Sequence, residues 1–156
     1  MMRALTRAAF RPVRFWDSSA IVPLLVAEPS SAAVMAEYER DRELVVWWAT
    51  EVECVSALAR LERDGSLDGP AMVDALDRLG ALAQAWQEVQ PIARVRQTAI
   101  RMLRVHGLRG ADALQLGAAL AVAEERPASL QVVTLDDRLG QAAEREGFRV
   151  VIPDRG

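Results

Sequence analysis

The sequence predicts a doubly wound α/β fold: a three-layer sandwich in which a mainly parallel central sheet of four to five strands lies between two layers of helices. Two observations predict it. Short apolar or β-branched runs of strand length alternate with segments of helical periodicity along the whole chain. Strands separated by helices form parallel sheets that are covered on both faces. The length of 156 residues, with 51% hydrophobic and 26% charged residues, suits one globular domain.

The alternation begins near the N-terminus. Val13–Trp16 is a short apolar run, and it predicts a strand that ends at Asp17. Ser18 and Ser19 are favourable N-cap residues for the helix that follows, in which Pro23 is tolerated because it falls close to the first turn. A second helix is predicted over 30–40 and a second strand over 43–47.

The remaining elements continue the pattern. Residues 64–66 (Asp-Gly-Ser), 106–107 (His-Gly) and Gly147 are stop signals for helices, and Pro91 restricts the run 88–92 to the edge of a sheet. In chain order we predict helices over 50–63 and 68–86, an edge strand over 88–92, helices over 93–105 and 110–125, a strand over 130–135, a helix over 136–146 and a strand over 148–152.

Positive charge is concentrated at the N-terminus. Residues 1–14 contain four arginines and no acid, a charge of +4. Because the net charge of the whole chain is −3, the rest of the chain has a charge of −7. We interpret 1–12 as a basic N-terminal extension and 13–153 as one domain. No segment near the N-terminus has the apolar length of a secretory leader or a membrane span, so we expect a cytoplasmic protein with no membrane partner. The acidic remainder argues against nonspecific adhesion to nucleic acid.

Several residue types are too rare to support common chemistries. The chain has one histidine (His106), one cysteine (Cys54) and no lysine; all 19 positive charges are arginine. A structural zinc site needs four Cys or His ligands, and a P-loop or a Schiff base needs a lysine. An internal disulfide is impossible, and a catalytic triad would have to use His106. If the protein is an enzyme, its chemistry depends on carboxylates.

Acidic residues stand where predicted strands end or helices begin. Asp17 follows the first strand, Glu53 and Asp112 lie in the first turns of two helices, and Asp136 follows the strand over 130–135, with Asp137 beside it. Sites in open parallel sheets form at the carboxyl ends of strands, so these acids are expected to converge. Converging carboxylates without cations suit Mg²⁺ or Mn²⁺, which can activate water for attack on a phosphodiester.

Each of these acids also has a structural interpretation. Thr50 and Glu53 have the spacing of a capping box, Asp112 suits the positive end of its helix, and Asp136 suits an N-cap. Asp17 differs, because an acid between an apolar strand and an apolar helix is expected to be buried, and a buried carboxylate needs a partner or a metal.

Four stretches in this order resemble the PIN domain, most closely its VapC-type toxin ribonucleases of toxin–antitoxin pairs. They are FWDSSAIV (15–22), TEVECVSAL (50–58), HGLRGADALQL (106–116) and VTLDDRL (133–139), and the resemblance extends over about 13–153. It implies a PIN-like fold and a Mg²⁺- or Mn²⁺-dependent endoribonuclease that hydrolyses RNA as the toxin of such a pair. It also implies a homodimer and a small antitoxin partner that covers the site.

The resemblance assigns roles to particular residues. It places Asp17, Glu53, Asp112 and Asp136 in the acidic quartet that binds the metal, with Asp137 as the alternative to Asp136. Ser18 and Thr134 match hydroxyl positions that contact the metal ligands or the substrate. Independently of the resemblance, Arg109 and Arg138 lie beside Asp112 and Asp136 in sequence, where two roles are open: they either hold phosphate or balance the charge of the acids. Gln115 stands where many relatives have His.

Other functions remain open at this stage. A PIN-type nuclease could process RNA or cut DNA without a toxin role, or the fold could serve as a catalytically inactive interaction module. A receiver-type phosphoryl-transfer domain is disfavoured because its essential lysine is missing.

Overall fold

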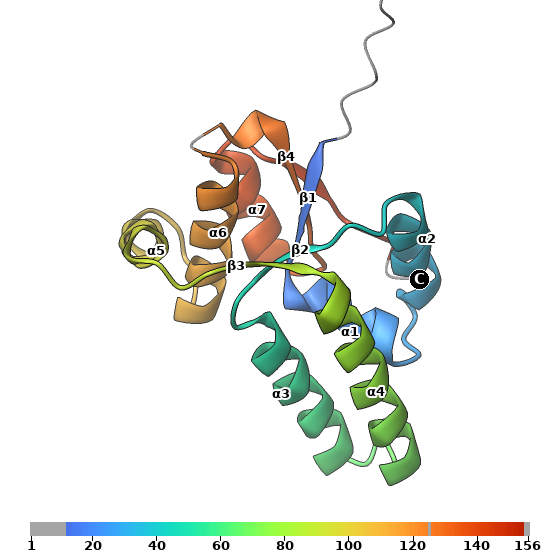
Figure 1. The fold of residues 1–156 in the computed structure, drawn as a ribbon. Helices are drawn as coiled ribbons and strands as arrows, with labels where there is room; N and C mark the ends of the chain where they lie inside the picture. The colour runs from blue at the N-terminus through green and yellow to red at the C-terminus, as the bar shows by residue number, and fades with distance from the viewer. Residues whose placement is uncertain (1–11, 125, 155–156) are drawn as a thin grey trace, which may run out of the picture.

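The computed structural model describes residues 12–124 and 126–154, and within them the chain forms one five-stranded sheet flanked by α-helices (Figure 1). The strands are β1 (Val13–Trp16), β2 (Val45–Trp47), β3 (Gln87–Val89), β4 (Leu130–Val133) and β5 (Arg149–Val151). The helices are α1 (Ser18–Leu25), α2 (Ser31–Arg40), α3 (Thr50–Arg63), α4 (Gly69–Ala85), α5 (Ala93–Val105), α6 (Gly110–Val122) and α7 (Asp137–Arg145), with a 3-10 turn at Pro127–Ser129.

The sheet is parallel at every pairing, in the order β3-β2-β1-β4-β5. The chain first builds outward from β1 through β2 to β3 and then returns to add β4 and β5 on the other side of β1. The strand order therefore reverses between β1 and β4, where Trp16 is in register with Val133. In such sheets the crevice for ligands lies beyond the carboxyl ends of the two strands at the reversal. The predicted sandwich and its parallel sheet are confirmed.

Alternation along the strands builds two separate cores. Phe15, Val45 and Val132 face α5, α6 and α7, whereas Trp16, Val46 and Val133 face α1, α2, α3 and α4. This is the period of two expected of a strand that is covered on both faces. Figure 1 shows α6 and α7 on one side of the sheet, with α3 and α4 projecting beyond it on the other.

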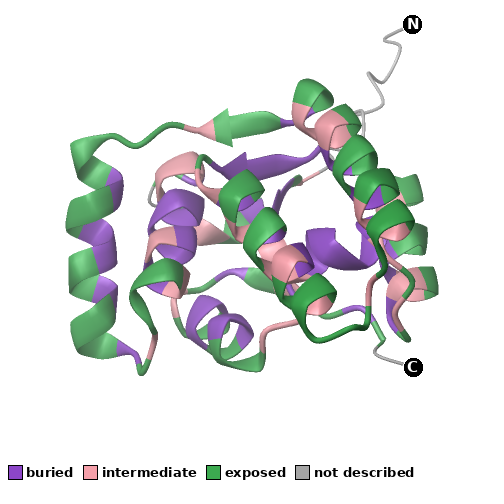
Figure 2. Ribbon diagram, turned by 90° about the horizontal axis from the view of Figure 1, so that it is seen from below, coloured by how far each residue is buried: buried purple, intermediate pink, exposed green. Residues whose placement is uncertain are grey.

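Helix α5 packs mainly against α6, and the contact is very close. Buried residues lie on the side of α5 that faces the rest of the molecule, and the outer side is exposed (Figure 2). A Cβ added at Gly117 of α6 would lie 2.8 Å from the backbone oxygen of Val95 and 3.2 Å from the backbone nitrogen of Ala99. Glycine is therefore required where the two helix backbones meet.

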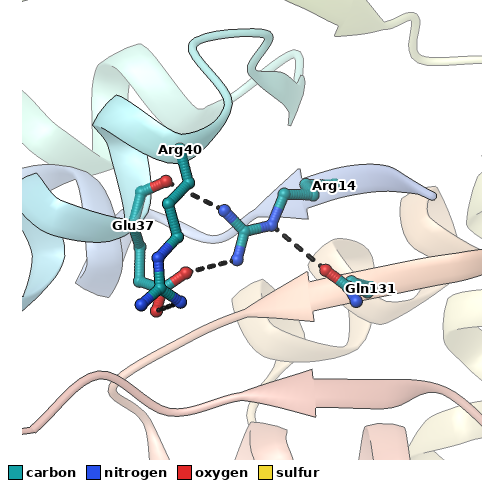
Figure 3. Close-up of polar contacts among 4 residues, drawn as sticks. All are labelled: Arg14, Glu37, Arg40 and Gln131. Carbon is teal, nitrogen blue, oxygen red and sulfur yellow. Dashed lines mark hydrogen bonds and ion pairs between the residues drawn. The ribbon is translucent and has the colours of Figure 1, made fainter. Parts of the chain in front are cut away.

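The first strand carries a buried arginine near its start. The Arg14 guanidinium donates to the Glu37 carboxylate at 2.6 Å, to the Glu37 backbone carbonyl at 2.9 Å and to the Gln131 side-chain oxygen at 3.2 Å (Figure 3). Arg40 pairs with the other Glu37 oxygen at 3.1 Å. Sequence composition groups Arg14 with the basic N-terminus, but this side chain belongs to the fold and is neutralised by α2.

Some predicted boundaries are wrong by a few residues. Strand β2 begins at Val45 rather than Glu43, because residues 43 and 44 lie outside the ladder with β1 and β3. The edge strand β3 ends at Val89, before Pro91, which has no N–H to donate. Of the proposed extension over 1–12, all but Pro12 lies outside the described residues. No helix in the described part of the chain is long and apolar enough to cross a membrane.

Candidate functional site

A pocket at the carboxyl edge of the sheet brings together all four predicted acids, Asp17, Glu53, Asp112 and Asp136. Asp17 directly follows β1 and Thr134 directly follows β4, so the pocket begins at the reversal of the strand order. Its volume is about 440 Å³. Its lining residues come from α1 and the residue before it, from α3, from α6 and from the turn before α7: Asp17, Ser18, Ser19, Val22, Val52, Glu53, Ser56, Ala57, Arg60, Ala111, Asp112 and Asp136.

Asp17 is the deepest of the four acids, with 3% of its surface exposed. As the N-cap of α1, it accepts from the backbone N–H of Ser19 at 2.6 Å and from the Ser19 hydroxyl at 2.8 Å. The Thr134 hydroxyl donates to the same carboxylate oxygen that the Ser19 hydroxyl contacts. The Ser19 hydroxyl in turn accepts from the backbone N–H of Leu135, and the Thr134 hydroxyl accepts from that of Asp136, so the backbone holds both hydroxyls that contact Asp17.

The electrostatic environment of Asp17 is unbalanced. Its three donors are neutral, and the described residues provide no arginine within ion-pair distance of it. Burial raises the pKa of Asp17 to about 6, although the hydrogen bonds from Thr134 and Ser19 act in the opposite direction. The negative charge of Asp136 also raises it. The carboxylate form of Asp17 would therefore be stabilised by an added cation.

Glu53 does not close a capping box. Helix α3 begins at Thr50 itself, with Ala49 at the N-cap position and no side-chain cap. The Glu53 side chain instead accepts from the Gln115 amide of α6 at 2.8 and 3.3 Å, and from the Ser18 hydroxyl. Burial raises the pKa of Glu53, and the nearby charges of Asp17 and Asp112 add to this effect. The predicted capping box is wrong because Thr50 lies inside the helix, and the Glu53 side chain is instead held by a residue 62 positions away.

Asp112 and Asp136 lie where the sequence predicted, at the starts of α6 and α7. Burial raises the pKa of Asp112, as does the charge of Asp136, while Arg109 and Arg138 act to lower it. Asp136 caps α7 by accepting from the backbone N–H of Leu139 at 3.0 Å. Asp136 lines the pocket, whereas Asp137 is the first residue of α7 and is not among the lining residues.

The donor set fits a hard divalent cation, although the acids are not preassembled around one point. Among the described residues, no three His, Cys, Asp or Glu side chains are close enough to form a ready metal site. The four carboxylates nevertheless face one pocket, and two of them, Asp17 and Glu53, raise the energy of each other's charged form. Mg²⁺ and Mn²⁺ prefer oxygen ligands, and either ion would neutralise the negative charge of these mutually repelling carboxylates.

Sequence reasoning missed seven of the twelve lining residues, and two of these, Ser19 and Arg60, bear on the chemistry of the pocket. It treated Ser19 as an alternative N-cap, but Ser19 contacts both Asp17 and Thr134. It also passed over Arg60, which lies on α3 at helical spacing from Glu53 and is the one cation among the lining residues. The spacing of 53, 56, 57 and 60 along one helix face is a signal that could have found it.

The two rare residues lie away from the chemistry. Cys54 is buried in the core beneath α3 and its pKa is raised to about 12, chiefly by burial, so it is not a thiolate nucleophile. His106 ends α5 and contacts Glu146 at 2.7 Å, outside the acidic pocket. Neither Cys54 nor His106 lines the pocket, so neither side chain can act as a nucleophile or a base there.

A parallel sheet with acids at its reversal point places the protein in a known class. Residues 14–145 match the family model described as the PIN domain, and the chain belongs to that family. Its relatives include Ribonuclease VapC45 and Ribonuclease VapC49 of Mycobacterium tuberculosis (strains CDC 1551 and H37Rv). Each is 33% identical over 139 residues, which cover 89% of this chain and 94% of the relative.

Solved structures agree on the fold. The crystal structure of FitAcB from Neisseria gonorrhoeae superposes with a TM-score of 0.62 at 19% identity, covering 88% of this chain and 96% of that one. At this identity the likeness concerns the fold alone.

Proposed function

We propose that this protein is a metal-dependent endoribonuclease that hydrolyses RNA phosphodiester bonds and acts as the toxin of a toxin–antitoxin pair. The observation that carries the proposal is the convergence of Asp17, Glu53, Asp112 and Asp136 on one pocket at the switch point of the sheet. The relatives named ribonuclease VapC, at 33% identity over most of the chain, support RNA as the substrate.

The four acids are assigned to a divalent cation, Mg²⁺ or Mn²⁺. Bound there, such an ion would supply an activated water and would offset the negative charge that develops on the phosphate. The chain's own residues fix the acids in place. Ser19 and Thr134 hold the carboxylate of Asp17, and Ser18 and Gln115 hold that of Glu53.

Arginines at the pocket are assigned to the RNA backbone. Arg109 and Arg138 act electrostatically to lower the pKa of Asp112, so their positive charges act on the side of the pocket that Asp112 occupies. Arg60 lines the pocket from α3, where it is partly exposed. Arginine forms paired hydrogen bonds with phosphate oxygens, which suits all three positions to an anionic substrate entering an acidic pocket.

The proposed partners follow from the same assignment. We expect an antitoxin protein that covers the acidic pocket and prevents RNA from entering it. We also expect a homodimer, and action in the cytoplasm, where the RNA substrate is found.

A cleavage assay tests the nuclease assignment. Purified protein is incubated with single-stranded RNA and with DNA of the same sequence, in Mg²⁺, in Mn²⁺ and in EDTA. We expect cleavage of RNA only with metal, and a loss of at least 100-fold in Asp17→Asn. Asp77→Asn, which removes an exposed acid of α4, is the matched control and should retain activity.

Three results would count against the assignment. Equal cleavage of DNA would favour a general nuclease, full activity of Asp17→Asn would show that the site is elsewhere, and no cleavage of any substrate would favour a binding module. For the toxin role, expression of the wild-type chain should arrest growth, and Asp17→Asn should not. Normal growth with active wild-type enzyme would point to RNA processing.

A further inference from the structure

The side chain of Gln115 is buried between the two helices that carry Glu53 and Asp112. It lies on α6, three residues after Asp112 and on the same face, and only 1% of it is exposed. Its amide nitrogen contacts Glu53 Oε2 at 2.8 Å, Glu53 Oε1 at 3.3 Å and Thr50 Oγ1 at 3.2 Å. A single amide group therefore spans from α6 to two residues of α3.

The orientation of this amide is determined by its partner. An ionised carboxylate only accepts hydrogen bonds, so the NH₂ end of Gln115 must face Glu53 and the carbonyl end must face away. In this orientation Gln115 Oε1 is buried and has no hydrogen-bond partner among the described residues. A buried unpaired carbonyl costs about 1–3 kcal/mol. The contacts to Glu53 outweigh this cost, because the reversed amide would place oxygen against oxygen.

The link joins two matched pairs of residues. Thr50 and Glu53 are three residues apart on α3, and Asp112 and Gln115 are three residues apart on α6. Gln115 contacts both members of the first pair, so it connects the helix of Asp112 to the helix of Glu53 at the level of the pocket. A neutral amide makes this connection without adding a charge to a pocket that a cation has to enter.

An ordinary packing role would not require these atoms. The neighbouring Leu116 is equally buried and faces the core beside α5 and α7, where an apolar side chain suffices. A leucine or methionine at position 115 would fill similar volume without leaving a buried carbonyl unpaired. The polar side chain of Gln115 is explained by its hydrogen bonds to the Glu53 carboxylate.

We propose that Gln115 is a positioning residue of the acidic pocket, which fixes the Glu53 carboxylate relative to Asp112 by linking α6 to α3. This inference rests on the proposed function only in naming the divalent cation that the four acids would bind. The positioning itself is a property of the metal-free chain.

The test compares Gln115→Leu with the full-length wild type. Mn²⁺ affinity is measured by titration calorimetry or electron paramagnetic resonance, together with kcat and KM for RNA. We expect Mn²⁺ affinity to fall about ten-fold, the usual effect of losing a partner of a metal ligand. The melting temperature should change little, because removal of the unpaired carbonyl offsets part of the loss of the contacts to Glu53 and Thr50. Gln115→His, which retains one N–H donor, should recover part of the affinity.

Two further variants separate positioning from packing. Leu116→Ala leaves a cavity in the same helix and should lower the melting temperature without lowering the Mn²⁺ affinity of the folded protein. In a Glu53→Gln background, Gln115→Leu should have no additional effect on Mn²⁺ affinity, because its partner carboxylate is gone. An unchanged Mn²⁺ affinity in Gln115→Leu, or an equal loss in the Glu53→Gln background, would overturn the inference.

A measurement without metal keeps this inference distinct from the nuclease assignment. The ¹³C resonance of the Glu53 side-chain carboxyl is recorded in EDTA for the wild type and for Gln115→Leu. A clear change supports positioning even if the wild type neither binds Mn²⁺ nor cuts RNA, in which case only the proposed function fails. An unchanged resonance overturns positioning whatever the RNA assay gives.

Discussion

Strand β1 carries two buried charges, and the chain treats them differently. Arg14 near its start is 8% exposed, and Asp17 just beyond its end is 3% exposed. Arg14 donates to a carboxylate, a backbone carbonyl and a side-chain amide (Figure 3). Asp17 accepts from two hydroxyls and one N–H, all neutral. One charge is compensated by the fold, and the other is only solvated by it.

The difference separates a structural charge from a functional one. Removing a charge from water is costly unless an opposite charge lies near it. Around Arg14 that charge is Glu37 of α2, three residues before the pairing Arg40. The charges that couple to Asp17 are those of other acids, Asp136 and Glu53, and its pKa is raised to about 6, chiefly by burial. The missing opposite charge at the carboxyl edge of the sheet is what a divalent cation would supply.

The largest expected effect comes from breaking the compensated pair. Glu37→Gln leaves the buried Arg14 charge without its carboxylate and should lower the free energy of unfolding by about 3 kcal/mol or more, measured by urea denaturation. Arg40→Gln removes an exposed arginine, with 73% of its side chain exposed, from the same carboxylate and should cost less than about 1 kcal/mol. Equal losses in the two variants would show that burial of Arg14 does not matter.

The uncompensated acid should make stability depend on pH with the opposite sign to an ordinary ion-paired carboxylate. The pKa of Asp17 is higher in the folded protein, about 6 against 3.8, so the folded state binds the proton more tightly. Its contribution to stability is present below about pH 3.8 and is lost as pH rises through 6. In EDTA, the free energy of unfolding of wild type relative to Asp17→Asn should fall by about 3 kcal/mol between pH 3 and pH 7. A difference independent of pH would contradict the burial of this charge.

A divalent cation should offset the loss of stability caused by the ionised Asp17, which lies just beyond the end of β1, and should not affect the Arg14–Glu37 pair near its start. At a Mg²⁺ or Mn²⁺ concentration 100 times its dissociation constant, the wild type should gain about 2.7 kcal/mol of stability, measured at pH 7 by thermal or urea unfolding. Glu37→Gln should gain as much, because its defect lies at the other end of the strand. Asp17→Asn should gain much less. Equal gains in all three proteins would place the cation elsewhere.

The sequence was sufficient for the architecture and for the acids. Runs such as Val13–Trp16 and 130–135 are local signals, and parallel strands necessarily place their carboxyl ends at one edge. The positions of Asp17 and Asp136 follow from those two facts. The strand order does not, because it depends on which helices cover which face.

The features that the sequence did not predict depend on contacts between residues that are far apart in the chain. The sequence placed Arg14 in the first strand but did not show that its charge is neutralised, because its partner Glu37 is 23 residues away, on a different element. The local spacing of Thr50 and Glu53 matched a capping box, and the actual partner of Glu53, Gln115, could not be seen because it is 62 residues away. Ser18 and Ser19 are equivalent as letters, and only the capping of α1 by Asp17 turns Ser19 toward that carboxylate and leaves Ser18 near Glu53.

The absence of a side chain at Gly117 has a consequence that extends beyond packing. This glycine lets the backbone of α6 lie against α5, and α6 also carries Asp112 and Gln115. A methyl group at position 117 would force the two helix backbones apart, and because α5 packs mainly against α6, α5 is the helix that would have to move. An alanine at this position would look conservative in the sequence, yet it would separate two helices, one of which carries Asp112 and Gln115, while every acid stayed intact.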